Sequence, residues 1–400
     1  MTRIAVIGAG QAGASLVAKL RSLGFDGALT LIGNEPVLPY QRPPLSKKYL
    51  MGEMELERLY LRPESYYREQ EITLRTGGRV DKIDALNKAI HIGGEPVAYD
   101  MLAVTTGSTP RQLPAEIGGE MNNVFVMRSL ADADAMAPMM QPGKRALVIG
   151  GGYIGLEAAA VARKAGVEVT LVELSERILQ RVAAPQTSDY VRKLHESHGV
   201  DIRENTGIKR LLGHEKVTGA GFSDGTSEPF DFVVVGIGVV PDTLLAANAG
   251  LEIDNGIKTD AYGRTSDPAI WSAGDCASFP SPQGQIRLES VQNAIDQAEC
   301  VAENMLGAGM EYDPKPWFWS DQYNVKLQIA GLNTGYDSVT ERCSDGATSH
   351  WYYQGGTLLA VDAMNAPRDY MVGKRLIEAH KSPPPEMVAD PEADLKWLLK

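Results

Sequence analysis

Short apolar runs followed by glycine-rich turns and alanine-rich stretches recur along the chain. The run at residues 4–7 precedes Gly8–Gly13, and the run at 146–149 precedes Gly150–Gly155. A short, uninterrupted apolar run is typical of a buried strand. The alanine-rich stretch after each glycine turn favours a helix. Each segment therefore predicts a strand, a tight turn and a helix, which is the first half of a βαβ unit.

Further runs continue this alternation. In the first part of the chain we expect a helix over 14–23, strands over 28–32 and 99–106, and a strand with a hairpin over 79–92. In the second part we expect strands over 145–149, 168–173 and 231–237, and helices over 156–164 and 185–198. The repeated βαβ order predicts parallel sheets in a doubly wound α/β fold.

The pattern changes after Pro241. A short strand beginning at Ile270 ends in Gly274-Asp275, and a helix is expected over 291–306. From residue 317 onward we expect strands over 326–332, 350–354 and 357–363 and a helix over 370–380. The segment 382–394 has four prolines and many acids, so we expect it to be partly ordered at best.

Composition and charge exclude several classes of protein. The net charge of −12 argues against nucleic acid as a partner. We expect no membrane partner, because the chain has no apolar run near the ~20 residues that span a bilayer. The first strand begins by Ile4, so we expect no signal or transit peptide. The cysteines at 276, 300 and 343 form no CxxC motif, which disfavours disulfides and a metal site and favours a cytoplasmic protein.

The two glycine turns match the GxGxxG fingerprint of dinucleotide-binding sites. The first glycine permits the turn, the second lets the backbone approach phosphates, and the third lets the helix pack on the strand. A pyrophosphate then lies on the helix N-terminus. A single such turn could equally serve only to join a strand to a helix. Two copies behind apolar strands predict two dinucleotides, as in a flavin enzyme that a nicotinamide reduces.

An acidic residue after the second strand of such a unit takes the ribose hydroxyls of the dinucleotide. Glu173 lies 18 residues after Gly155 (173 minus 155), near the expected spacing of about 20. No arginine follows it directly, so we predict NADH rather than NADPH. In the first unit the matching position is Asn34 or Glu35, and the sequence does not choose between them.

Three other stretches are candidates for chemistry. The loop 40–48 contains Arg42 and Lys47, which could meet phosphates or a reduced flavin, or could be solvated cations of a surface loop. Gly274-Asp275 could face a flavin or could only cap a turn. Trp317, Trp319 and Tyr323 form an aromatic cluster, which is most often part of a core.

Several strings together resemble one family, over nearly the whole chain. They are 8–13, 42–47 (RPPLSK), 103–110 (AVTTGSTP), 150–157 (GGGYIGLE), 236–238, 271–277 (WSAGDCA), 289–294 and 317–323 (WFWSDQY). The chain resembles the flavin-dependent ferredoxin reductases of bacterial oxygenase systems, of the putidaredoxin reductase and biphenyl dioxygenase ferredoxin reductase type. The resemblance implies a glutathione-reductase-like α/β fold with two Rossmann-like dinucleotide-binding domains and a C-terminal α+β domain. It implies an FAD-binding domain at 1–108 and 239–316, an NADH-binding domain at 109–238, and a C-terminal domain at 317–400.

The resemblance also implies roles for individual residues. Lys47 would lie near the flavin N5 and pair with Glu157, and Trp319 would lie near the flavin on the ferredoxin side. The other FAD contacts would come from Gly8, Gly10, Ala12, Gly13, Val80, Arg128, Asp275 and Val291. The NADH contacts would come from Gly152, Tyr153, Ile154, Glu173 and Gly238.

The implied activity is transfer of a hydride from NADH to FAD, and then of single electrons to a [2Fe–2S] ferredoxin. That ferredoxin would feed a haem-thiolate monooxygenase or a ring-hydroxylating dioxygenase. A rubredoxin reductase is the nearest alternative, followed by a flavoprotein like NADH oxidase or like apoptosis-inducing factor. The chain lacks the cysteine pair of a disulfide reductase and has no cysteine in 44–47. An acidic ferredoxin would need a local basic patch, for which the candidates are Lys315, Lys326, Arg368, Lys374 and Arg375.

Overall fold

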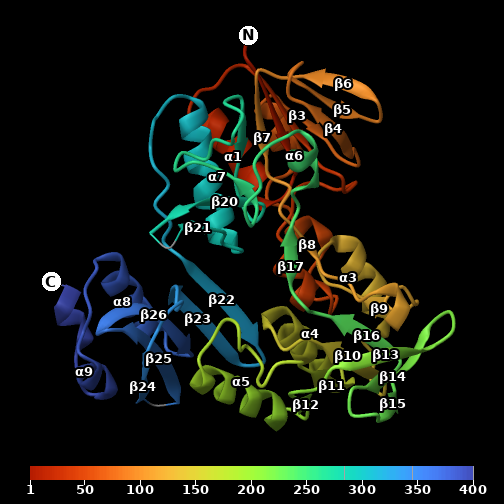
Figure 1. Ribbon diagram of the computed structural model, residues 1–400, viewed down its shortest axis with the longest axis vertical. Helices are drawn as coiled ribbons and strands as arrows, with labels where there is room; N and C mark the ends of the chain where they lie inside the picture. Colours follow the sequence, from red (N-terminus) through yellow and green to blue (C-terminus); the bar gives the residue numbers. More distant parts are fainter. Residues whose placement is uncertain (283, 345, 400) are drawn as a thin grey trace. The chain divides into compact units, whose positions relative to one another are not determined.

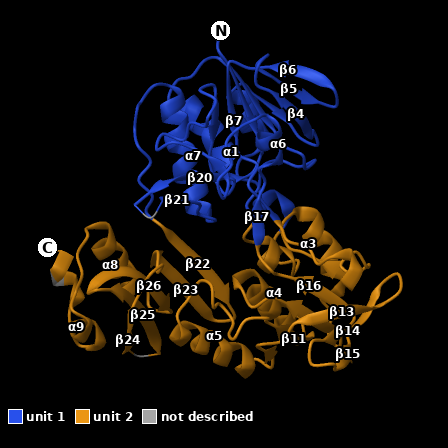
Figure 2. Cartoon of the chain, viewed as in Figure 1, with its two compact units in different colours: residues 1–41, 55–109, 239–315 blue, residues 42–54, 110–238, 316–400 orange. Residues whose placement is uncertain are grey.

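A computed structural model describes residues 1–282, 284–344 and 346–399, and the chain divides into two compact units (Figure 1, Figure 2). Unit 1 comprises residues 1–41, 55–109 and 239–315, and unit 2 comprises 42–54, 110–238 and 316–400. The chain passes between the units after residues 41, 54, 109, 238 and 315, so each unit is assembled from segments far apart in the sequence.

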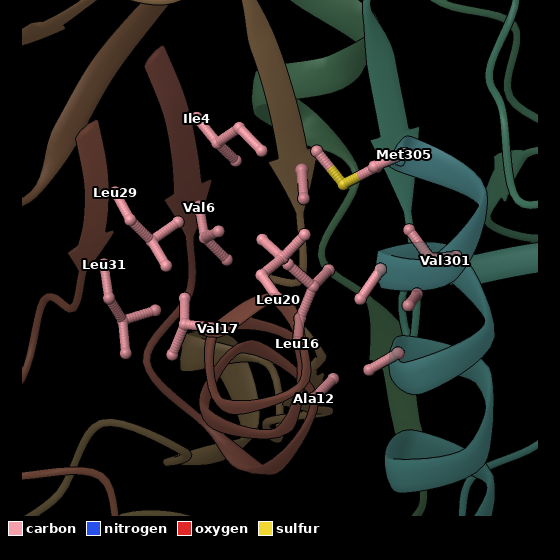
Figure 3. Packing of buried hydrophobic residues seen from close by; sticks show 14 of the residues in the cluster. Ile4, Val6, Ala12, Leu16, Val17, Leu20, Leu29, Leu31, Val301 and Met305 are labelled. Carbon is pink, nitrogen blue, oxygen red and sulfur yellow. The ribbon is translucent and has the colours of Figure 1, made fainter. Parts of the chain in front are cut away.

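A five-stranded parallel sheet forms the centre of unit 1. In spatial order its strands are β19 (Ile270–Ser272), β7 (Met101–Val104), β1 (Arg3–Ile7), β2 (Ala28–Ile32) and β3 (Ile72–Arg75). Helices α1 (Gln11–Ser22) and α7 (Val291–Met305) pack together beside it. Figure 3 shows Leu16 and Leu20 of α1 between the side chains of the sheet and Val301 of α7. Because both helices bury apolar faces here, residues 291–305 complete the core begun by residues 3–32.

Smaller elements complete unit 1. An antiparallel sheet contains β4 (Val80–Asp84), β5 (Ala89–Ile92) and β6 (Glu95–Ala98). The remaining strands are β8 (Ser108–Pro110), which pairs with β17 (Val239–Pro241), and the sheet of β18 (Ile257–Lys258), β20 (Ala277–Ser281) and β21 (Gly284–Ile286). The short helices are α2 (Glu64–Glu69) and α6 (Leu244–Asn248).

Unit 2 contains a second parallel sheet of the same kind. Its order is β12 (Asp201–Arg203), β11 (Glu168–Val172), β10 (Arg145–Ile149), β16 (Phe232–Val235) and β9 (Val124–Phe125). The helices of this part are α3 (Leu130–Met136), α4 (Tyr153–Lys164) and α5 (Pro185–Ser197). A further sheet contains β13 (Ile208–Gly213), β14 (Val217–Phe222) and β15 (Ser227–Pro229). All four residues of β16 are buried, as expected for a parallel sheet covered on both faces.

The C-terminal part of unit 2 is an antiparallel sheet with helices. In spatial order the strands are β22 (Trp317–Gln322), β23 (Val325–Gly331), β26 (Thr357–Met364), β25 (Ala347–Gln354) and β24 (Ser338–Ser344). The helices are α8 (Pro367–Glu378) and α9 (Pro385–Ala389). Trp351 and Tyr353 of β25 and Tyr370 of α8 belong to the buried cluster of this part.

The predicted α/β class with two Rossmann-like sheets is confirmed, and β2 and β10 have the predicted bounds. Helices α1 and α4 begin at Gln11 and Tyr153, three residues before the predicted starts, because the helical turn already includes the last part of each fingerprint. Residues 42–54 group with unit 2, and 110–238 and 316–400 share that unit. The division of the chain into FAD, NADH and C-terminal domains stays a prediction.

The expectation that 382–394 is partly ordered at best is wrong. Val388 is fully buried, and the guanidinium of Arg342 donates hydrogen bonds to the carbonyl oxygens of four tail residues. These are Val388 (3.1 Å), Asp390, Pro391 (2.8 Å) and Ala393 (3.1 Å). One arginine therefore satisfies backbone groups that composition alone would leave to water.

None of the described helices combines enough length with enough apolar character to cross a bilayer.

Candidate functional site

The glycine turn of unit 1 uses its three glycines in different ways. Gly8 has a φ of +107°, and a Cβ on it would lie 2.3 Å from the Thr105 carbonyl oxygen. A Cβ on Gly13 would lie 2.0 Å from the Gly8 carbonyl oxygen. A Cβ on Gly10 would meet no described atom within 4 Å. The fold itself therefore demands the first and third glycines, while the second leaves open space beside the backbone.

The turn of unit 2 repeats this arrangement. Gly150 has a φ of +104°, and a Cβ there would lie 2.4 Å from the Gly236 carbonyl oxygen. A Cβ on Gly155 would lie 2.1 Å from the Gly150 carbonyl oxygen, whereas one on Gly152 would meet no described atom within 4 Å. Both turns thus keep space where a ligand's phosphates would approach the backbone.

The helices after the two turns have bare N-termini. Within the described residues, neither α1 nor α4 has a side-chain cap or an acid in its first turn. Ser129 and Ser290 cap α3 and α7, whereas α5 and α6 share these two features with α1 and α4, so the open glycine turn is what sets α1 and α4 apart. The first N–H groups of a helix and the positive end of its dipole bind anions. Two uncapped helix starts beside open glycine turns therefore fit two pyrophosphates.

Asp275 lies near the unit 1 turn. Strands β19, β7 and β1 are parallel, so the loops that follow them meet at one edge of the sheet. A Cβ on Gly274 would lie 2.9 Å from the Ala12 Cβ, and the Gly274 N–H donates to Gln297 of α7 (2.8 Å). The half-buried Asp275 accepts a hydrogen bond from the Ser108 hydroxyl (3.0 Å). A carboxylate is thus held beside the glycine turn and α7.

Two other predicted residues of unit 1 occupy different settings. Val80, in β4, is buried, while Val291 is the half-buried first residue of α7. Their contacts with FAD stay predictions.

The backbone register locates the position in unit 1 that matches Glu173. The Gly8 N–H donates to the Ile32 carbonyl and the Gly150 N–H to the Val172 carbonyl, both at 2.8 Å. By this register the residue equivalent to Glu173 is Gly33, where a Cβ would lie 2.7 Å from that of Ala9. The two predicted ribose ligands therefore come one and two positions later.

Those two residues differ in their surroundings. Asn34 is exposed, whereas the Glu35 carboxylate accepts a hydrogen bond from the Tyr40 hydroxyl (2.6 Å). Which of them meets a ribose stays a prediction.

Glu173 is fixed at the glycine turn of unit 2. Its Oε2 accepts from the Gly151 N–H (2.7 Å) and its Oε1 from the Ser175 N–H (2.8 Å). The half-buried carboxylate therefore has a set orientation next to the fingerprint, as a ribose ligand needs.

Apolar side chains are exposed at the same sheet edge. Ile154, Leu174 and Ile237 are 43%, 77% and 38% exposed, and they follow β10, β11 and β16. Gly238, with a φ of +96°, follows Ile237 and is also exposed. This edge offers apolar surface to the rings of a dinucleotide together with the carboxylate and the uncapped helix.

Tyr153 has its side chain in the interior of unit 2. Its ring lies 5.0 Å from that of Phe318, and it packs against the cluster that contains Val325, Leu327 and Met364. Burial raises the pKa of its hydroxyl well above the ordinary value, and that oxygen has no hydrogen-bond partner in the described part of the chain. Only the backbone of Tyr153, at the start of α4, is therefore left to serve the predicted NADH contact.

Lys47 and Glu157 form an ion pair within unit 2. Lys47 lies in the short segment η1 (Leu45–Tyr49), where its own backbone is non-helical (φ −133°, ψ −109°), and its Nζ also donates to the Pro43 carbonyl (3.3 Å). Glu157 lies one turn into α4 and is 7% exposed. Its Oε2 also accepts from Ser46 (3.2 Å), and its Oε1 accepts from Ser320 of β22 (2.8 Å). The carboxylate therefore joins η1, α4 and β22.

Sequence reasoning missed Ser46 and Ser320 as partners of Glu157. Both lie in strings that carried the resemblance, RPPLSK and WFWSDQY, and this position in two family strings was the only signal for them. A serine has no periodic pattern that reveals what it bonds to over 111 or 163 residues of chain.

Three other predicted residues also belong to unit 2. The Arg42 guanidinium donates to the Arg128 carbonyl (2.6 Å), and the Arg128 N–H donates to Asp132 (3.0 Å). Trp319 is half-buried in β22, with its ring 5.5 Å from that of Trp317. The structure thus brings Arg42 and Arg128 together, and the role of all three beside a flavin stays a prediction.

Comparison with known proteins identifies relatives over almost the whole chain. Residues 2–298 match the family described as pyridine nucleotide-disulphide oxidoreductase, and residues 317–399 match the reductase C-terminal family. Rhodocoxin reductase of Rhodococcus erythropolis is 43% identical over 402 residues, which cover 99% of this chain and 94% of that protein. Rubredoxin-NAD(+) reductase of Pseudomonas putida is 35% identical over 373 residues, covering 91% and 96%.

A solved structure is equally similar along its whole length. One chain of the covalent putidaredoxin reductase–putidaredoxin complex superimposes with a TM-score of 0.96 at 39% identity. The match covers 100% of this chain and 98% of that chain.

Proposed function

This chain belongs to the pyridine nucleotide-disulphide oxidoreductase family, and from that premise we propose that it is an NADH-dependent ferredoxin reductase of an oxygenase system. The resemblance inferred from the sequence strings is confirmed by the full-length similarity to rhodocoxin reductase and to putidaredoxin reductase. The observation that carries the proposal is this similarity, together with the two glycine turns that keep open space at Gly10 and Gly152.

The chain's own residues would divide the binding of two cofactors. The N-terminus of α1 and the carboxylate of Asp275 would hold FAD, and the N-terminus of α4 and the carboxylate of Glu173 would hold NADH. When bound, FAD would supply the redox chemistry that links a two-electron donor, NADH, to a one-electron acceptor, a [2Fe–2S] ferredoxin. The task of the protein is to position the reacting groups and to exclude competing reactions.

Lys47 would lie at the flavin, with Glu157 as its partner. Pairing with a buried carboxylate holds a flexible ammonium in one orientation. A fixed positive charge would favour negative charge that develops on a reduced ring, without itself carrying electrons. Arg42, Arg128 and Trp319 of unit 2 complete the proposed flavin contacts.

The acceptor distinguishes this proposal from the second candidate. A rubredoxin reductase would use the same scaffold. This chain is 35% identical to rubredoxin-NAD(+) reductase and 43% identical to rhodocoxin reductase, which favours the ferredoxin acceptor.

Disulfide reduction is disfavoured by the cysteines. Cys276 is fully buried, which raises the pKa of its thiol, and Cys300 and Cys343 are remote from each other in sequence.

A basic surface of unit 2 is the proposed dock for an acidic ferredoxin. Arg368 and Arg375 are exposed on α8, seven residues apart and hence on one helix face. Lys326 of β23 is exposed, and its N–H donates to Asn365 just before α8 (2.8 Å). Reversing the charge of both arginines should raise the KM for ferredoxin and leave flavin reduction by NADH unchanged. An unchanged ferredoxin KM would remove this surface from the proposal.

The activity is tested by mixing the purified yellow protein anaerobically with NADH or with NADPH and following the visible flavin band. A [2Fe–2S] ferredoxin is then added, with cytochrome c as the final acceptor. We expect fast bleaching by NADH and cytochrome c reduction that depends on ferredoxin. Bleaching without ferredoxin-dependent reduction, but with transfer to rubredoxin, would support the second candidate instead. A protein without bound flavin would overturn both.

The role of Lys47 is tested by Lys47→Ala, with Lys48→Ala as the matched control because Lys48 is exposed. Only Lys47→Ala should change the rate of flavin reduction and the flavin potential. An unchanged rate and potential would refute the role.

We also propose a cytoplasmic location, supported by the separation of the three cysteines in the sequence.

A further inference from the structure

A line of hydrogen bonds extends from Glu157 through the interior of unit 2. Ser320 Oγ lies 2.8 Å from Glu157 Oε1, and Gln322 Nε2 lies 3.0 Å from Ser320 Oγ. Gln322 Oε1 lies 2.7 Å from His195 Nε2, and His195 Nδ1 lies 3.3 Å from the Tyr323 hydroxyl. Four links therefore connect the carboxylate that pairs with Lys47 to an aromatic side chain in the turn after β22.

The middle of this line is closed to water. Ser320, Gln322 and His195 are 0%, 3% and 0% exposed. Ser320 and Gln322 are alternate residues of β22, so they point to the same face of the sheet, and His195 comes from α5. Buried polar groups have to bond to one another, because no solvent replaces a missing partner.

The chemistry of the groups sets the direction of every bond. A carboxylate only accepts, so the Ser320 hydroxyl donates to Glu157, and its oxygen is left to accept from the Gln322 amide NH₂. The Gln322 carbonyl then faces His195 and needs a donor, so His195 carries its proton on Nε2. Burial lowers the pKa of His195 to about 4, so the ring is neutral and its bare Nδ1 accepts from Tyr323.

Every donor therefore points toward Glu157. Aligned hydrogen bonds polarise one another, and together they fix the orientation of the acceptor at the end of the line. The line does not conduct protons, because an amide would have to give up an N–H to pass one on. Its effect is on the position of Glu157 rather than on proton delivery.

We propose that Ser320, Gln322 and His195 are positioning residues that hold Glu157 against Lys47 in the orientation that flavin reduction requires. The proposal rests on the proposed function, and it extends the site from the ion pair to a line of buried residues on β22 and α5.

Tyr323 fixes the far end of the line. Its ring stacks on His198 with centroids 3.7 Å apart and planes 12° apart, and its backbone has a φ of +54°. His198 follows the last residue of α5, so the stack joins the end of that helix to the turn between β22 and β23. The line is anchored at both ends by packed elements.

The kinetic test uses holoenzyme with Ser320→Ala or Gln322→Leu and a matched control, Ser349→Ala. Ser349 is equally buried in the antiparallel sheet, donates to Asp369 (2.7 Å) and accepts from Trp351 (2.9 Å), so its bonds copy those of Ser320 away from Glu157. Stopped-flow flavin reduction at saturating NADH should be about tenfold slower in the first two variants. It should change less than about twofold in the control, and the apparent Kd for NADH should stay constant in all three.

A spectroscopic test reads the line without turnover. The ¹⁵N shifts of the His195 ring, in holoenzyme with labelled histidine at pH 7, report which nitrogen carries the proton. We expect protonated Nε2 and bare Nδ1 in the wild type, with that preference lost in Gln322→Leu. A proton on Nδ1 in the wild type would reverse the bond directions and overturn the proposal.

The outcomes separate the two levels of inference. Equal rates in Ser320→Ala and Ser349→Ala would overturn the positioning role while the proposed function stands. A wild type that NADH does not reduce would overturn the proposed function and with it the positioning role. The His195 spectrum would then still decide the bond directions. Slow reduction confined to the two variants of the line, with the expected tautomer, would support both.

Discussion

Replacing Glu173 by glutamine removes one negative charge from the glycine turn of unit 2 while keeping the side-chain length. The carboxylate accepts from two backbone N–H groups, at 2.7 Å and 2.8 Å, so its position is set before any ligand arrives. A 2′-phosphate on NADPH would bring negative charge to the place where a 2′-OH would donate to Glu173. We therefore expect Glu173→Gln to shift the preference toward NADPH.

The magnitude follows from Coulomb's law. Two unit charges about 4 Å apart repel by about 1 kcal/mol in water and about 4 kcal/mol near a protein surface. Glu173 is half-buried, so we take about 1–2 kcal/mol, which is about 5- to 30-fold in the ratio of kcat/KM for NADPH to that for NADH. NADH itself should bind less well, because the glutamine amide presents one carbonyl oxygen to two N–H groups.

The assay measures kcat/KM for NADPH and for NADH by anaerobic flavin reduction, in the wild type and in Glu173→Gln. It is run at low and at high salt, since screening should shrink the difference between the two proteins. Glu176→Gln is the control, because it removes the same charge from an exposed position three residues later. An unchanged ratio in Glu173→Gln, or an equal change in Glu176→Gln, would refute the reasoning.

Three further predictions concern stability and binding. Gly152→Ala should fold normally but bind NADH about tenfold more weakly. Gly155→Ala, with its Cβ 2.1 Å from a carbonyl oxygen, should instead lose about 2 kcal/mol of stability in thermal unfolding. Equal melting temperatures for the two variants would contradict this difference. Arg342→Ala should cost about 2–4 kcal/mol in urea unfolding and expose residues 390–393 to proteolysis; a tail as resistant as in the wild type would disprove the anchoring role. Because the folded-state pKa of His195 is about 4 against an ordinary 6.5, the wild type should lose up to about 3 kcal/mol as pH falls from 6.5 to 4. His195→Gln should lack that loss of stability. If the unfolding free energies of the two proteins fell in parallel as the pH is lowered, His195 would not be the cause.

The local pattern was sufficient for the central strands of the two parallel sheets, whereas the edge strands β3, β12 and β9 were not predicted. Strands β2 and β10 could be predicted to the residue because a short, mostly apolar run between polar turns is typical of a strand in a buried parallel sheet. The two glycine turns could also be predicted from the sequence, since Gly8 and Gly150 adopt a positive φ that other residues avoid.

The partners of Glu157 were less predictable. Its pairing with Lys47 came from family resemblance, and its bonds to Ser46 and Ser320 span 111 and 163 residues of chain. A hydrogen bond between distant side chains leaves no period in the sequence. The order of the tail was missed for the same reason, because it depends on Arg342, some 50 residues earlier.

The repeated passage of the chain between units 1 and 2 has a consequence for synthesis on the ribosome. Strand β7 ends at Val104, but its neighbour β19 begins only at Ile270, and α7, the partner of α1, begins at Val291. At about 5–20 residues per second, the free edge of β7 waits about 8–33 s for its neighbour to be made. During that interval an unpaired strand edge and an uncovered helix face are open to other chains. Synthesis of unit 1 thus begins first, but its core cannot be completed until residue 305 has been made, so nascent chains need protection from one another. Because the segments of the two units alternate along the chain, no single cut in the gene separates them.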